Sequence, residues 1–358
     1  MQKTKIIAIL IVAILLGTGG YVLLADDGSD PDTGDEYPSS VTITQNDGKN
    51  VTVATPLEKV CLVNVNAAEF MQVLGVADRV VGVSESIATD EEFGYIYDNV
   101  TTIGTYSTPN GEQILATGAT VVIGQCTSMA IKDTTVLENM GITVILLDCY
   151  GLNQQTSDLR QLSSLFGFEA QEKAEQYIAI FEDVISSVAQ ANADFGPDVT
   201  CYMELSNGKA YTSKAELTTL IDLAGGYNIV NDLVSDPTSS TQLLSNEVII
   251  AYDDGNGPDF ILLRKGGITD NASAESEYQT LVSRQGWGDL DATLNDNIYI
   301  ITLSGMMSGP RIYIGLVYLT ETFHPGVLDI DSEQLLEQYN LLFGYDITSF
   351  MEYRHLSS

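Results

Sequence analysis

The sequence predicts an α/β protein built from two Rossmann-like lobes with mostly parallel sheets, joined by one long α-helix. Short apolar runs alternate with helical patterns in both halves of the chain, which is typical of parallel strands covered on both faces. Between the halves, apolar residues recur at the spacing of one helix face over several turns. The 358 residues, 44% of them hydrophobic, are enough for two buried cores.

The N-terminal 40 residues carry targeting features rather than fold features. Lys3 and Lys5 precede an apolar run of roughly 20 residues, so residues 1–25 are expected to be a signal peptide or an uncleaved membrane anchor. Residues 26–40 are rich in Asp, Gly, Ser and Pro and are expected to form an acidic flexible tether. The folded part would then be extracytoplasmic, at the cell surface or in the periplasm, and attached to the membrane through this segment.

The first α/β lobe is predicted over residues 41–157. It opens with two short β-rich stretches, and continuous apolar runs then recur between helical patterns. These runs lie at residues 60–63, 80–83, 121–123 and 143–147. Runs of this kind predict buried parallel strands.

The connector and the second lobe follow. Tyr177, Phe181, Val184 and Val188 share one helix face, and residues 158–195 are therefore predicted to form a single helix that holds the lobes apart as a stiff spine. The second α/β lobe is predicted over residues 196–358. Its apolar runs lie at residues 199–203, 260–263 and 298–302, and helices follow from residue 311.

In parallel sheets, ligands bind beside the carboxyl ends of the strands. The loops at these ends supply the candidate ligand-binding residues Asn66, Glu85, Tyr106, Gln125, Tyr150, Tyr211, Arg264, Met306 and Arg311. For each of the tyrosines, packing in the core or at its rim is the ordinary alternative. Arg311, beside Pro310, could equally form a structural ion pair.

The cysteines do not indicate a metal site. Cys61, Cys126, Cys149 and Cys201 show no CxxC spacing and have no histidine nearby. Cys126 and Cys149 follow two strands at equivalent places, so a disulfide or a soft-metal pair is one interpretation, and unpaired packed cysteines are the default. Neither a resident metal nor a cofactor is expected.

One glutamate in each lobe occupies a matching position. Glu112 and Glu247 each begin a short helical pattern that leads into an apolar strand. An acid at a helix start is ordinarily explained by the helix dipole. Its occurrence once per lobe favours a second interpretation, a pair of docking points for one partner.

Charge and motifs narrow the class of function. The net charge of −34, from 49 acidic and 15 basic residues, excludes nucleic acid as a partner and suits a salty or extracellular setting. The sequence has no HExxH, GxSxG or GxxxxGK[ST] motif, and its two histidines, His324 and His355, lie in the C-terminal region. A binding protein is therefore expected, and not an enzyme.

Several stretches resemble the class III substrate-binding proteins of ABC importers, which bind ferric siderophores, haem or cobalamin. They include Leu74-Gly-Val-Ala-Asp-Arg-Val-Val-Gly-Val, Gly141-Ile-Thr-Val-Ile-Leu-Leu-Asp, Ala224-Gly-Gly-Tyr-Asn-Ile-Val and Ser308-Gly-Pro-Arg-Ile. The resemblance covers residues 55–350 and implies a monomer that captures a small-molecule metal chelate, either an iron chelate or a corrinoid, in a cleft between the lobes.

The resemblance also implies a partner, the permease of an ABC importer, and it assigns Glu112 and Glu247 to permease docking. Aromatic side chains that would stack on a corrin are not found in the equivalent loops, which makes a corrinoid the less favoured ligand. The alternative from another class is a membrane-anchored ligand sensor or adhesion domain with the same fold, because a fold does not fix a function.

Overall fold

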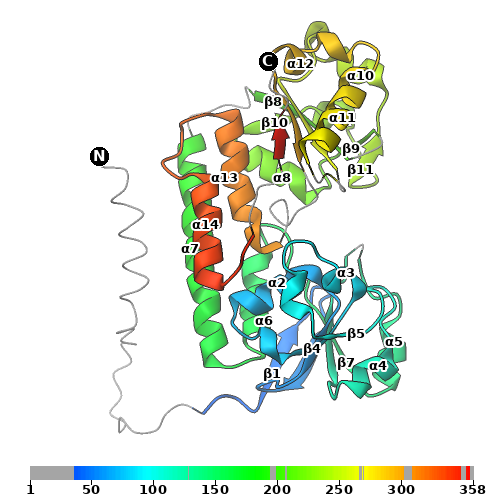
Figure 1. The fold of residues 1–358 in the computed structure, drawn as a ribbon, viewed down its shortest axis with the longest axis vertical. Helices are drawn as coiled ribbons and strands as arrows, with labels where there is room; N and C mark the ends of the chain where they lie inside the picture. The colour runs from blue at the N-terminus through cyan, green and yellow to red at the C-terminus, as the bar shows by residue number, and fades with distance from the viewer. Residues whose placement is uncertain are drawn as a thin grey trace.

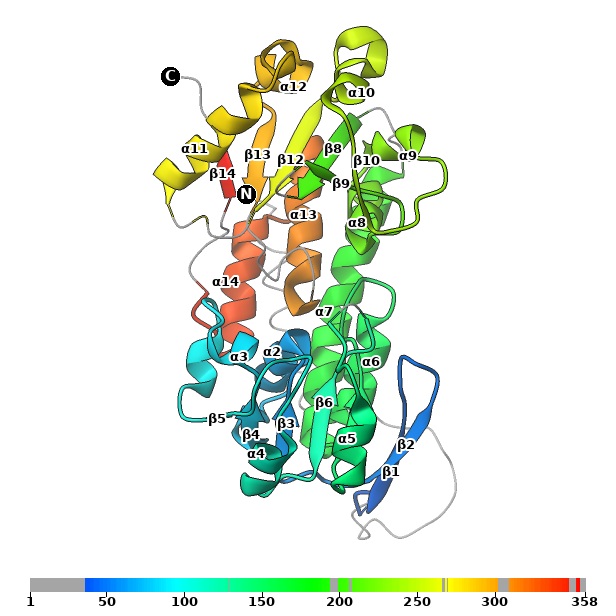
Figure 2. The same cartoon turned by 90° about the vertical axis from the view of Figure 1, so that its right-hand side faces the viewer.

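The computed structural model describes residues 36–127, 129–193, 199–205, 208–265, 268, 270–301, 309–347 and 352–354. It confirms the predicted α/β fold with two lobes, which lie at opposite ends of a column of long helices (Figures 1 and 2). The segment predicted as signal peptide or anchor, and most of the tether, lie outside the described residues. Among the residues described, no helix is long and apolar enough to cross a membrane.

The first lobe contains a five-stranded parallel sheet in the order β5-β4-β3-β6-β7. An antiparallel hairpin, β1 with β2, precedes it. The bounds are Ser40–Thr44 for β1, Asn50–Ala54 for β2, Val60–Leu62 for β3, Val80–Val83 for β4, Thr101–Thr102 for β5, Val121–Gly124 for β6 and Thr143–Leu146 for β7. All four apolar runs predicted for this lobe are strands.

The helices of the first lobe begin at polar caps that the sequence supplies. Asn64 accepts hydrogen bonds from the first amides of α2, and Asn110 does the same for α4. The elements are α2 (Val65–Val73), η1 (Ala77–Arg79), α3 (Glu85–Ala88), η2 (Gly94–Tyr97), α4 (Gly111–Ala116), α5 (Thr134–Asn139) and α6 (Gln155–Ser163).

The second lobe has a seven-stranded sheet with a parallel centre and antiparallel edges. The parallel strands are β10, β8, β12 and β13, whereas β9, β11 and β14 run antiparallel to their neighbours. The bounds are Val199–Leu205 for β8, Lys209–Tyr211 for β9, Gly226–Asn228 for β10, Thr241–Leu243 for β11, Phe260–Arg264 for β12, Ile298–Ile301 for β13 and Glu352–Arg354 for β14.

Several helices connect the strands of this second sheet, and α13 and α14 lie between β13 and β14 in the chain. They are α8 (Glu216–Leu223), α9 (Val230–Leu233), α10 (Asn246–Ile250), η3 (Tyr252–Gly255), α11 (Asn271–Val282), η4 (Trp287–Asp289), α12 (Asp291–Leu294), η6 (Gly309–Arg311), α13 (Ile312–Phe323) and α14 (Ser332–Phe343).

The connector differs from the single helix predicted over residues 158–195. The structure places the end of α6 in this range and begins the long helix, α7 (Phe168–Asn192), only after Gly167. Gly167 has a φ of +115°, which L side chains rarely adopt, so the helix cannot run through it. The buried face of α7 is the one predicted, with Tyr177, Phe181, Val184 and Val188 turned inward.

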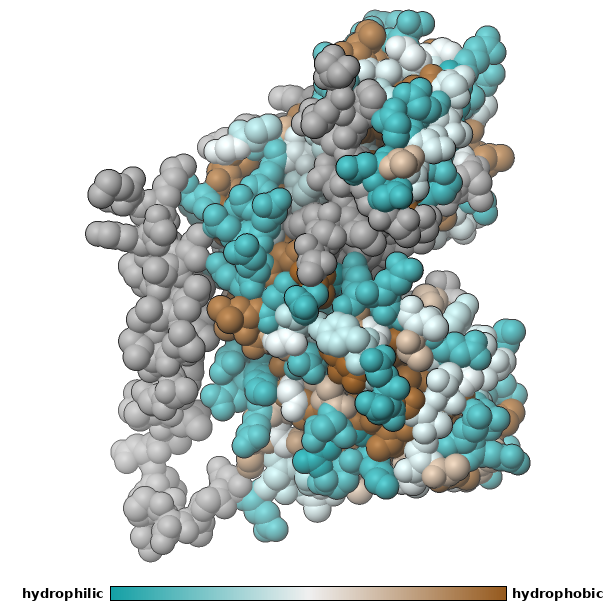
Figure 3. Space-filling model, in the orientation of Figure 1, coloured by the Kyte–Doolittle hydropathy of each residue, from teal (hydrophilic) through white to brown (hydrophobic). Residues whose placement is uncertain are grey.

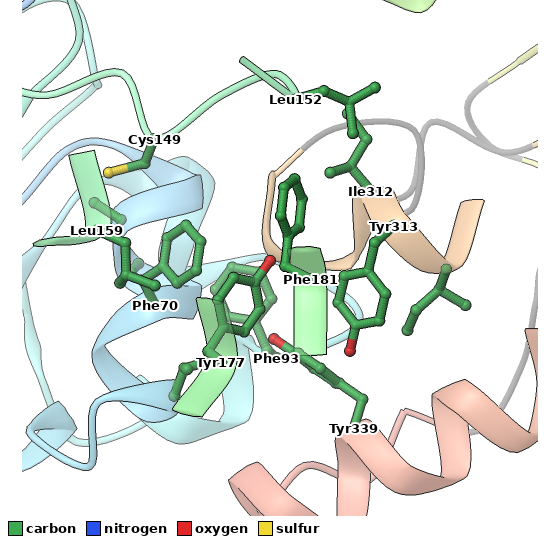
Figure 4. Packing of buried hydrophobic residues seen from close by; sticks show 14 of the residues in the cluster. Phe70, Phe93, Cys149, Leu152, Leu159, Tyr177, Phe181, Ile312, Tyr313 and Tyr339 are labelled. Carbon is green, nitrogen blue, oxygen red and sulfur yellow. The ribbon is translucent and has the colours of Figure 1, made fainter. Parts of the chain in front are cut away.

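Two helices predicted to end the second lobe instead lie along α7. In both views α13 and α14 run beside it as one column (Figures 1 and 2). Figure 4 shows Tyr177 of α7 between Phe70 of α2 and Tyr313 of α13, with ring centroids 5.2 and 6.0 Å away. Aromatic packing of this kind joins the column to the first lobe.

Candidate functional site

The carboxyl ends of the first-lobe strands are tied together by one buried amide, that of Asn64. Its Nδ2 donates to the carbonyls of Leu147 at 2.6 Å and Asp148 at 3.1 Å, while its Oδ1 accepts from Gln125 Nε2 at 2.9 Å. Asn64 follows β3, Gln125 follows β6, and the two carbonyls follow β7. The edge of the sheet where ligands of α/β proteins bind is therefore a fixed polar surface.

Asn66 lies where this surface meets the second half of the chain. Its Nδ2 donates to the carbonyl of Asp148 at 3.4 Å. A Cβ atom added to Gly309 would lie only 2.6 Å from Asn66 Oδ1, so a larger residue there would require the Asn66 side chain to move, and the φ of +68° at Gly309 is one that L side chains rarely adopt. Residue 309 is thus a glycine because the two segments touch there.

The loop after β7 also reaches the second lobe. The amide of Leu152 donates to Glu216 Oε1 at 3.0 Å, and Glu216 is the first residue of α8. Gly151, with a φ of +78°, lies so close to Glu216 that a Cβ would be 2.7 Å from its carboxylate. Tyr150 precedes this contact and is half-buried. Burial raises the pKa of Tyr150, and the charge of Arg264 acts in the opposite direction, so the two side chains are near each other.

Arg264 ends β12 and turns towards Tyr211 at the end of β9. Its Nη1 donates to the Tyr211 hydroxyl at 3.3 Å, whereas its Nε is buried and has no hydrogen-bond partner among the described residues. The Tyr211 carbonyl in turn accepts from Asn228 Nδ2 at 2.9 Å, which fixes the strand end. The structure thus brings Tyr150, from the first lobe, towards Tyr211 and Arg264, from the second.

These groups define the chemistry of the candidate site. Two phenols and a guanidinium donate hydrogen bonds, and the amides of Asn66 and Gln125 both donate and accept. Such a set recognises oxygen-rich ligands, and most strongly those with anionic oxygens. In the space-filling view, the surface is indented between the lobes on the side opposite the helix column (Figure 3).

Arg311 has a different place from the one expected of a ligand-binding residue. It is only 1% exposed, and its guanidinium contacts Glu69 at 2.7 Å and Glu92 at 2.5 Å. Tyr339 also donates to Glu69, at 2.8 Å. Burial opposes the charge of Arg311, but the two glutamates outweigh it, so the pKa of Arg311 lies well above its usual range. The guanidinium is occupied by protein carboxylates and joins η6 to the first lobe.

For the remaining candidates that the structure describes, Tyr106 and Glu85, no hydrogen bond or ion pair to Tyr150, Tyr211 or Arg264 is found among the described residues. Tyr106 is half-buried and packs against a first-lobe core cluster. This is the place expected of a tyrosine that packs at the rim of the core and does not bind a ligand. Glu85 is exposed at the first turn of α3. Met306 lies outside the described residues.

The two predicted docking glutamates are both exposed in the first turn of a short helix. Glu112 opens α4, where its amide donates to the Asn110 cap at 3.0 Å. Glu247 opens α10, and hydrogen bonds from its own amide and from the Ser245 hydroxyl lower its pKa. Both helices lie on the side of the molecule away from α7, one in each lobe (Figures 1 and 2).

All four cysteines are free thiols, so the disulfide considered for Cys126 and Cys149 is not formed. The amide of Cys126 donates to Asp148 Oδ1 at 2.8 Å, and its thiol faces the other carboxylate oxygen at 3.6 Å. Burial and the Asp148 charge raise the pKa of Cys126 to about 12, which opposes thiolate formation. Over the ranges that the structure describes, no cluster of three His, Cys, Asp or Glu side chains is arranged to hold a metal ion.

The ligand-binding candidates predicted from the sequence do not include Asn64 or Glu216. Asn64 had a local signal, because an asparagine before an apolar helical pattern is a typical N-cap, and a buried N-cap at a strand end lies at the ligand edge. Glu216 had none. Its partner, Leu152, is distant in sequence, and only the packing of the two lobes brings them together.

Comparison with known proteins places this geometry in a family. The sequence profile of the family described as periplasmic binding protein matches residues 60–303. An uncharacterised ABC transporter substrate-binding lipoprotein of Bacillus subtilis is 21% identical over 324 residues, which covers 89% of this chain and 96% of the relative. A cobalamin-binding protein of Halobacterium salinarum is 29% identical over 230 residues, which covers 60% of this chain and 57% of the relative.

Solved structures agree with this fold. A TroA-like periplasmic binding protein from Veillonella parvula superimposes with a TM-score of 0.71 at 18% identity, over 88% of this chain and all (100%) of the other. A periplasmic haem-binding protein from Pseudomonas aeruginosa has a TM-score of 0.59 at 17% identity, over 75% and 93% of the two chains. With more than half of its length matched by the family profile, the chain belongs to the periplasmic binding protein family and is a substrate-binding protein of the ABC transporter type.

Proposed function

We propose that this protein captures a metal chelate between its lobes, outside the cytoplasm, and delivers it to an ABC permease. The observation that carries the proposal is the approach of Tyr150, from the first lobe, to Tyr211 and Arg264, from the second. A ligand held by groups from both lobes would fix the position of one lobe relative to the other. A docking partner that contacts both lobes could detect this position. Asn66 and Gln125 would contact the same ligand from the first-lobe surface.

An iron chelate, a ferric siderophore or haem, fits this site better than a corrinoid does. Phenol and guanidinium groups suit the anionic oxygens of catecholates and of haem propionates. A corrin would need an aromatic surface, and Trp287, the only tryptophan, is 1% exposed in the second-lobe core. The names of similar proteins include cobalamin, haem and Fe3+-hydroxamate as ligands, so all three classes belong in the test.

For delivery, we propose that Glu112 and Glu247 bind basic side chains of the permease. Support comes from their exposure and from their position on one side of the molecule, in equivalent places of the two lobes. The protein would act as a monomer tethered to the membrane by its N-terminal segment, with no enzymatic activity of its own.

The ligand class can be tested by native mass spectrometry of the full-length chain in mild detergent. The protein is mixed with haem, a ferric tris-catecholate, a ferric tris-hydroxamate and cobalamin, and the retained species is identified by mass. We expect one iron chelate to be retained. If none of the four is retained, transport of these chelates is contradicted and a sensor or adhesion role takes its place.

Docking can be tested with a matched control. Glu333 is also an exposed first-turn acid, and its amide donates to the cap Asp331 just as that of Glu112 donates to Asn110, but it opens α14 in the helix column. Changing Glu112 and Glu247 together to Ala should abolish uptake and leave chelate affinity intact, whereas Glu333→Ala should change neither. Full uptake by the double variant would remove the docking assignment.

A further inference from the structure

The turn of the first-lobe hairpin, between β1 and β2, packs against the last strand of the five-stranded sheet. In the order β5-β4-β3-β6-β7, no further described strand pairs with the outer edge of β7. The turn covers the end of this edge instead. The amide of Leu146 donates to Gln45 Oε1 at 2.7 Å, and the Leu146 carbonyl accepts from the amide of Asn46 at 3.0 Å. The end of β7 is thereby fixed by hydrogen bonds of the kind that a neighbouring strand would supply.

The side chain of Asn46 continues from this edge into the loop that follows β7. Its Oδ1 accepts from the amide of Asp148, and its Nδ2 donates to Asp158 Oδ1 at 2.9 Å. The other oxygen, Asp158 Oδ2, accepts from the amide of Cys149 at 2.9 Å. Asp158 lies in α6 and is 0% exposed. Asn46 and the carboxylate that it binds therefore hold two consecutive amides of one loop, which requires a side chain that both donates and accepts.

This support falls where the loop backbone is least relaxed. Cys149 has a φ of +50°, which residues other than glycine rarely adopt, so its conformation depends on the surrounding contacts. Tyr150 is the next residue. Beyond it, the amide of Leu152 donates to Glu216 Oε1 of the second lobe at 3.0 Å. Tyr150 is therefore held between two anchored points, one formed by the hairpin turn with α6 and the other by α8.

The burial of the Asp158 carboxylate makes its contact with Asn46 costly to lose. Burial raises the pKa of Asp158, and the hydrogen bonds from Asn46 and from the Cys149 amide act in the opposite direction by stabilising the charged form. Without the Asn46 amide, Asp158 Oδ1 would lose this donor in a place from which water is excluded. The loop or the carboxyl group would then have to rearrange, because a buried carboxylate without its hydrogen bonds is strongly unfavourable.

We propose that Asn46 is a positioning residue for ligand binding. Through Asp148 and Asp158 it fixes the backbone ahead of Tyr150 and so sets the place of the Tyr150 hydroxyl between the lobes. This inference rests on the proposed function, in which Tyr150 contacts the chelate. Asn46 lies ahead of residues 60–303, which the family profile matches, so its role follows from the contacts of this chain alone.

The first test observes Tyr150 without a ligand. The full-length chain, in mild detergent, is labelled with fluorotyrosine, and the fluorine NMR signal of Tyr150 is assigned as the one that Tyr150→Phe removes. We expect Asn46→Ala to shift or broaden this signal. Gln45→Ala is the matched control, because Gln45 lies in the same turn but binds the amide of Leu146 within β7, and it should leave the Tyr150 signal in place.

A second variant addresses the same contact from α6. Asp158→Asn keeps the size of the side chain and removes a buried charge. It places an NH2 group where one of the two donors, Asn46 Nδ2 or the Cys149 amide, needs an oxygen. We expect it to move the Tyr150 signal as Asn46→Ala does. Asp158→Asn also provides the test if Asn46→Ala fails to fold, because it leaves no carboxylate in the core at this position.

The second test measures affinity. Calorimetric titration with haem, a ferric tris-catecholate, a ferric tris-hydroxamate and cobalamin identifies the chelate that the wild type binds. Asn46→Ala should weaken that binding about 2- to 10-fold, the usual contribution of one hydrogen bond, whereas Gln45→Ala should leave it unchanged. In a Tyr150→Phe background, Asn46→Ala should have no further effect, because Asn46 acts through the Tyr150 hydroxyl. An equal loss of affinity with and without that hydroxyl would contradict the inference.

The outcomes separate this inference from the proposed function. If the wild type binds none of the four chelates, the proposed function fails and the inference fails with it, even where the Tyr150 signal moves. If a chelate binds but Asn46→Ala and Asp158→Asn leave the Tyr150 signal unchanged, or Gln45→Ala moves it equally, the inference is overturned and the proposed function stands. The same conclusion follows if the signal moves and the affinity does not.

Discussion

Arg264 ends β12 and Arg311 ends η6, which follows the neighbouring strand β13 in the chain. Both were candidates for ligand binding, yet the structure gives them opposite surroundings. Arg311 is 1% exposed and contacts two glutamates from the first lobe. Arg264 is half-buried and donates to a phenol. Arg311 has its counter-ions within the protein, whereas no ion pair of Arg264 is found among the described residues.

The difference shows how a buried cation can be assigned to structure or to binding. Burial alone does not decide, because both guanidiniums have lost solvent. The counter-ion decides between the two roles. A buried cation that is paired with a carboxylate of the protein stabilises the fold, whereas one without such a pair favours binding of an external anion. Glu69 therefore belongs to the framework that positions the candidate site, and we propose that Arg264 belongs to the candidate site itself.

The largest effect is expected for the buried pair. Arg311→Gln leaves the Glu69 carboxylate buried without its partner, and we expect the free energy of unfolding to fall by about 3–5 kcal/mol. Urea denaturation followed by circular dichroism measures this change. A loss below about 1 kcal/mol would show that Arg311 is not a structural arginine and would remove the contrast with Arg264.

A second prediction concerns Cys126, on the first-lobe side of the candidate site. Cys126 lies on the first-lobe surface beside Asp148, and burial together with that carboxylate raises its pKa to about 12. The thiolate forms only as pH rises towards this value, so at pH 8 we expect iodoacetamide to label Cys126 on the order of 30-fold more slowly than an ordinary cysteine, after allowance for the greater nucleophilicity of a more basic thiolate. Labelling is measured by peptide mass mapping. A fast reaction would mean that positive charge governs this surface as well.

The next effect is smaller and isolates the phenol. Tyr211→Phe removes the hydroxyl that accepts from Arg264 and leaves the ring in place. We expect affinity for the retained anionic chelate to fall about 2- to 10-fold, the usual contribution of one hydrogen bond. Calorimetric titration gives the value. A gain in affinity would instead indicate that Tyr211 competes with the ligand for the guanidinium.

The smallest effect is the stability of the Arg264→Gln variant. Arg264 has no carboxylate partner among the described residues. Its replacement therefore leaves no buried carboxylate of these residues without a counter-ion. We expect its free energy of unfolding to stay within about 1 kcal/mol of the wild type in the same urea experiment. A loss as large as that of Arg311→Gln would make Arg264 a structural residue too.

Most of the fold could be predicted from the sequence because its signals are local. Continuous apolar runs identified the central strands, and the apolar face of α7 followed from its helical spacing. The predicted start of the long helix was wrong. The positive φ of Gly167 separates α7 from the preceding segment, and the spacing of hydrophobic residues carries no sign of this backbone conformation. The position of α13 and α14 beside α7 depends on contacts between distant segments, such as that of Tyr177 with Tyr313.

Part of the candidate site could be predicted because the ends of the strands also have local signals in the sequence. The rule that ligands bind at strand ends predicted Tyr150, Tyr211 and Arg264 as candidates, and the structure brings these three side chains near one another. It could not distinguish Arg264 from Arg311, because the counter-ions Glu69 and Glu92 precede Arg311 by more than half of the chain. Charge balance is a property of the folded structure, and it is this property that separates the two residues.

The central claim is that a metal chelate binds between the lobes, at the groups contributed by both. Its most direct test is anomalous diffraction at the iron edge from crystals of the protein grown with the chelate it retains. The account predicts a single iron peak between the end of β7 and the end of β12, close to Tyr150, Tyr211 and Arg264. An iron peak on the outer surface of either lobe, away from these residues, would contradict it.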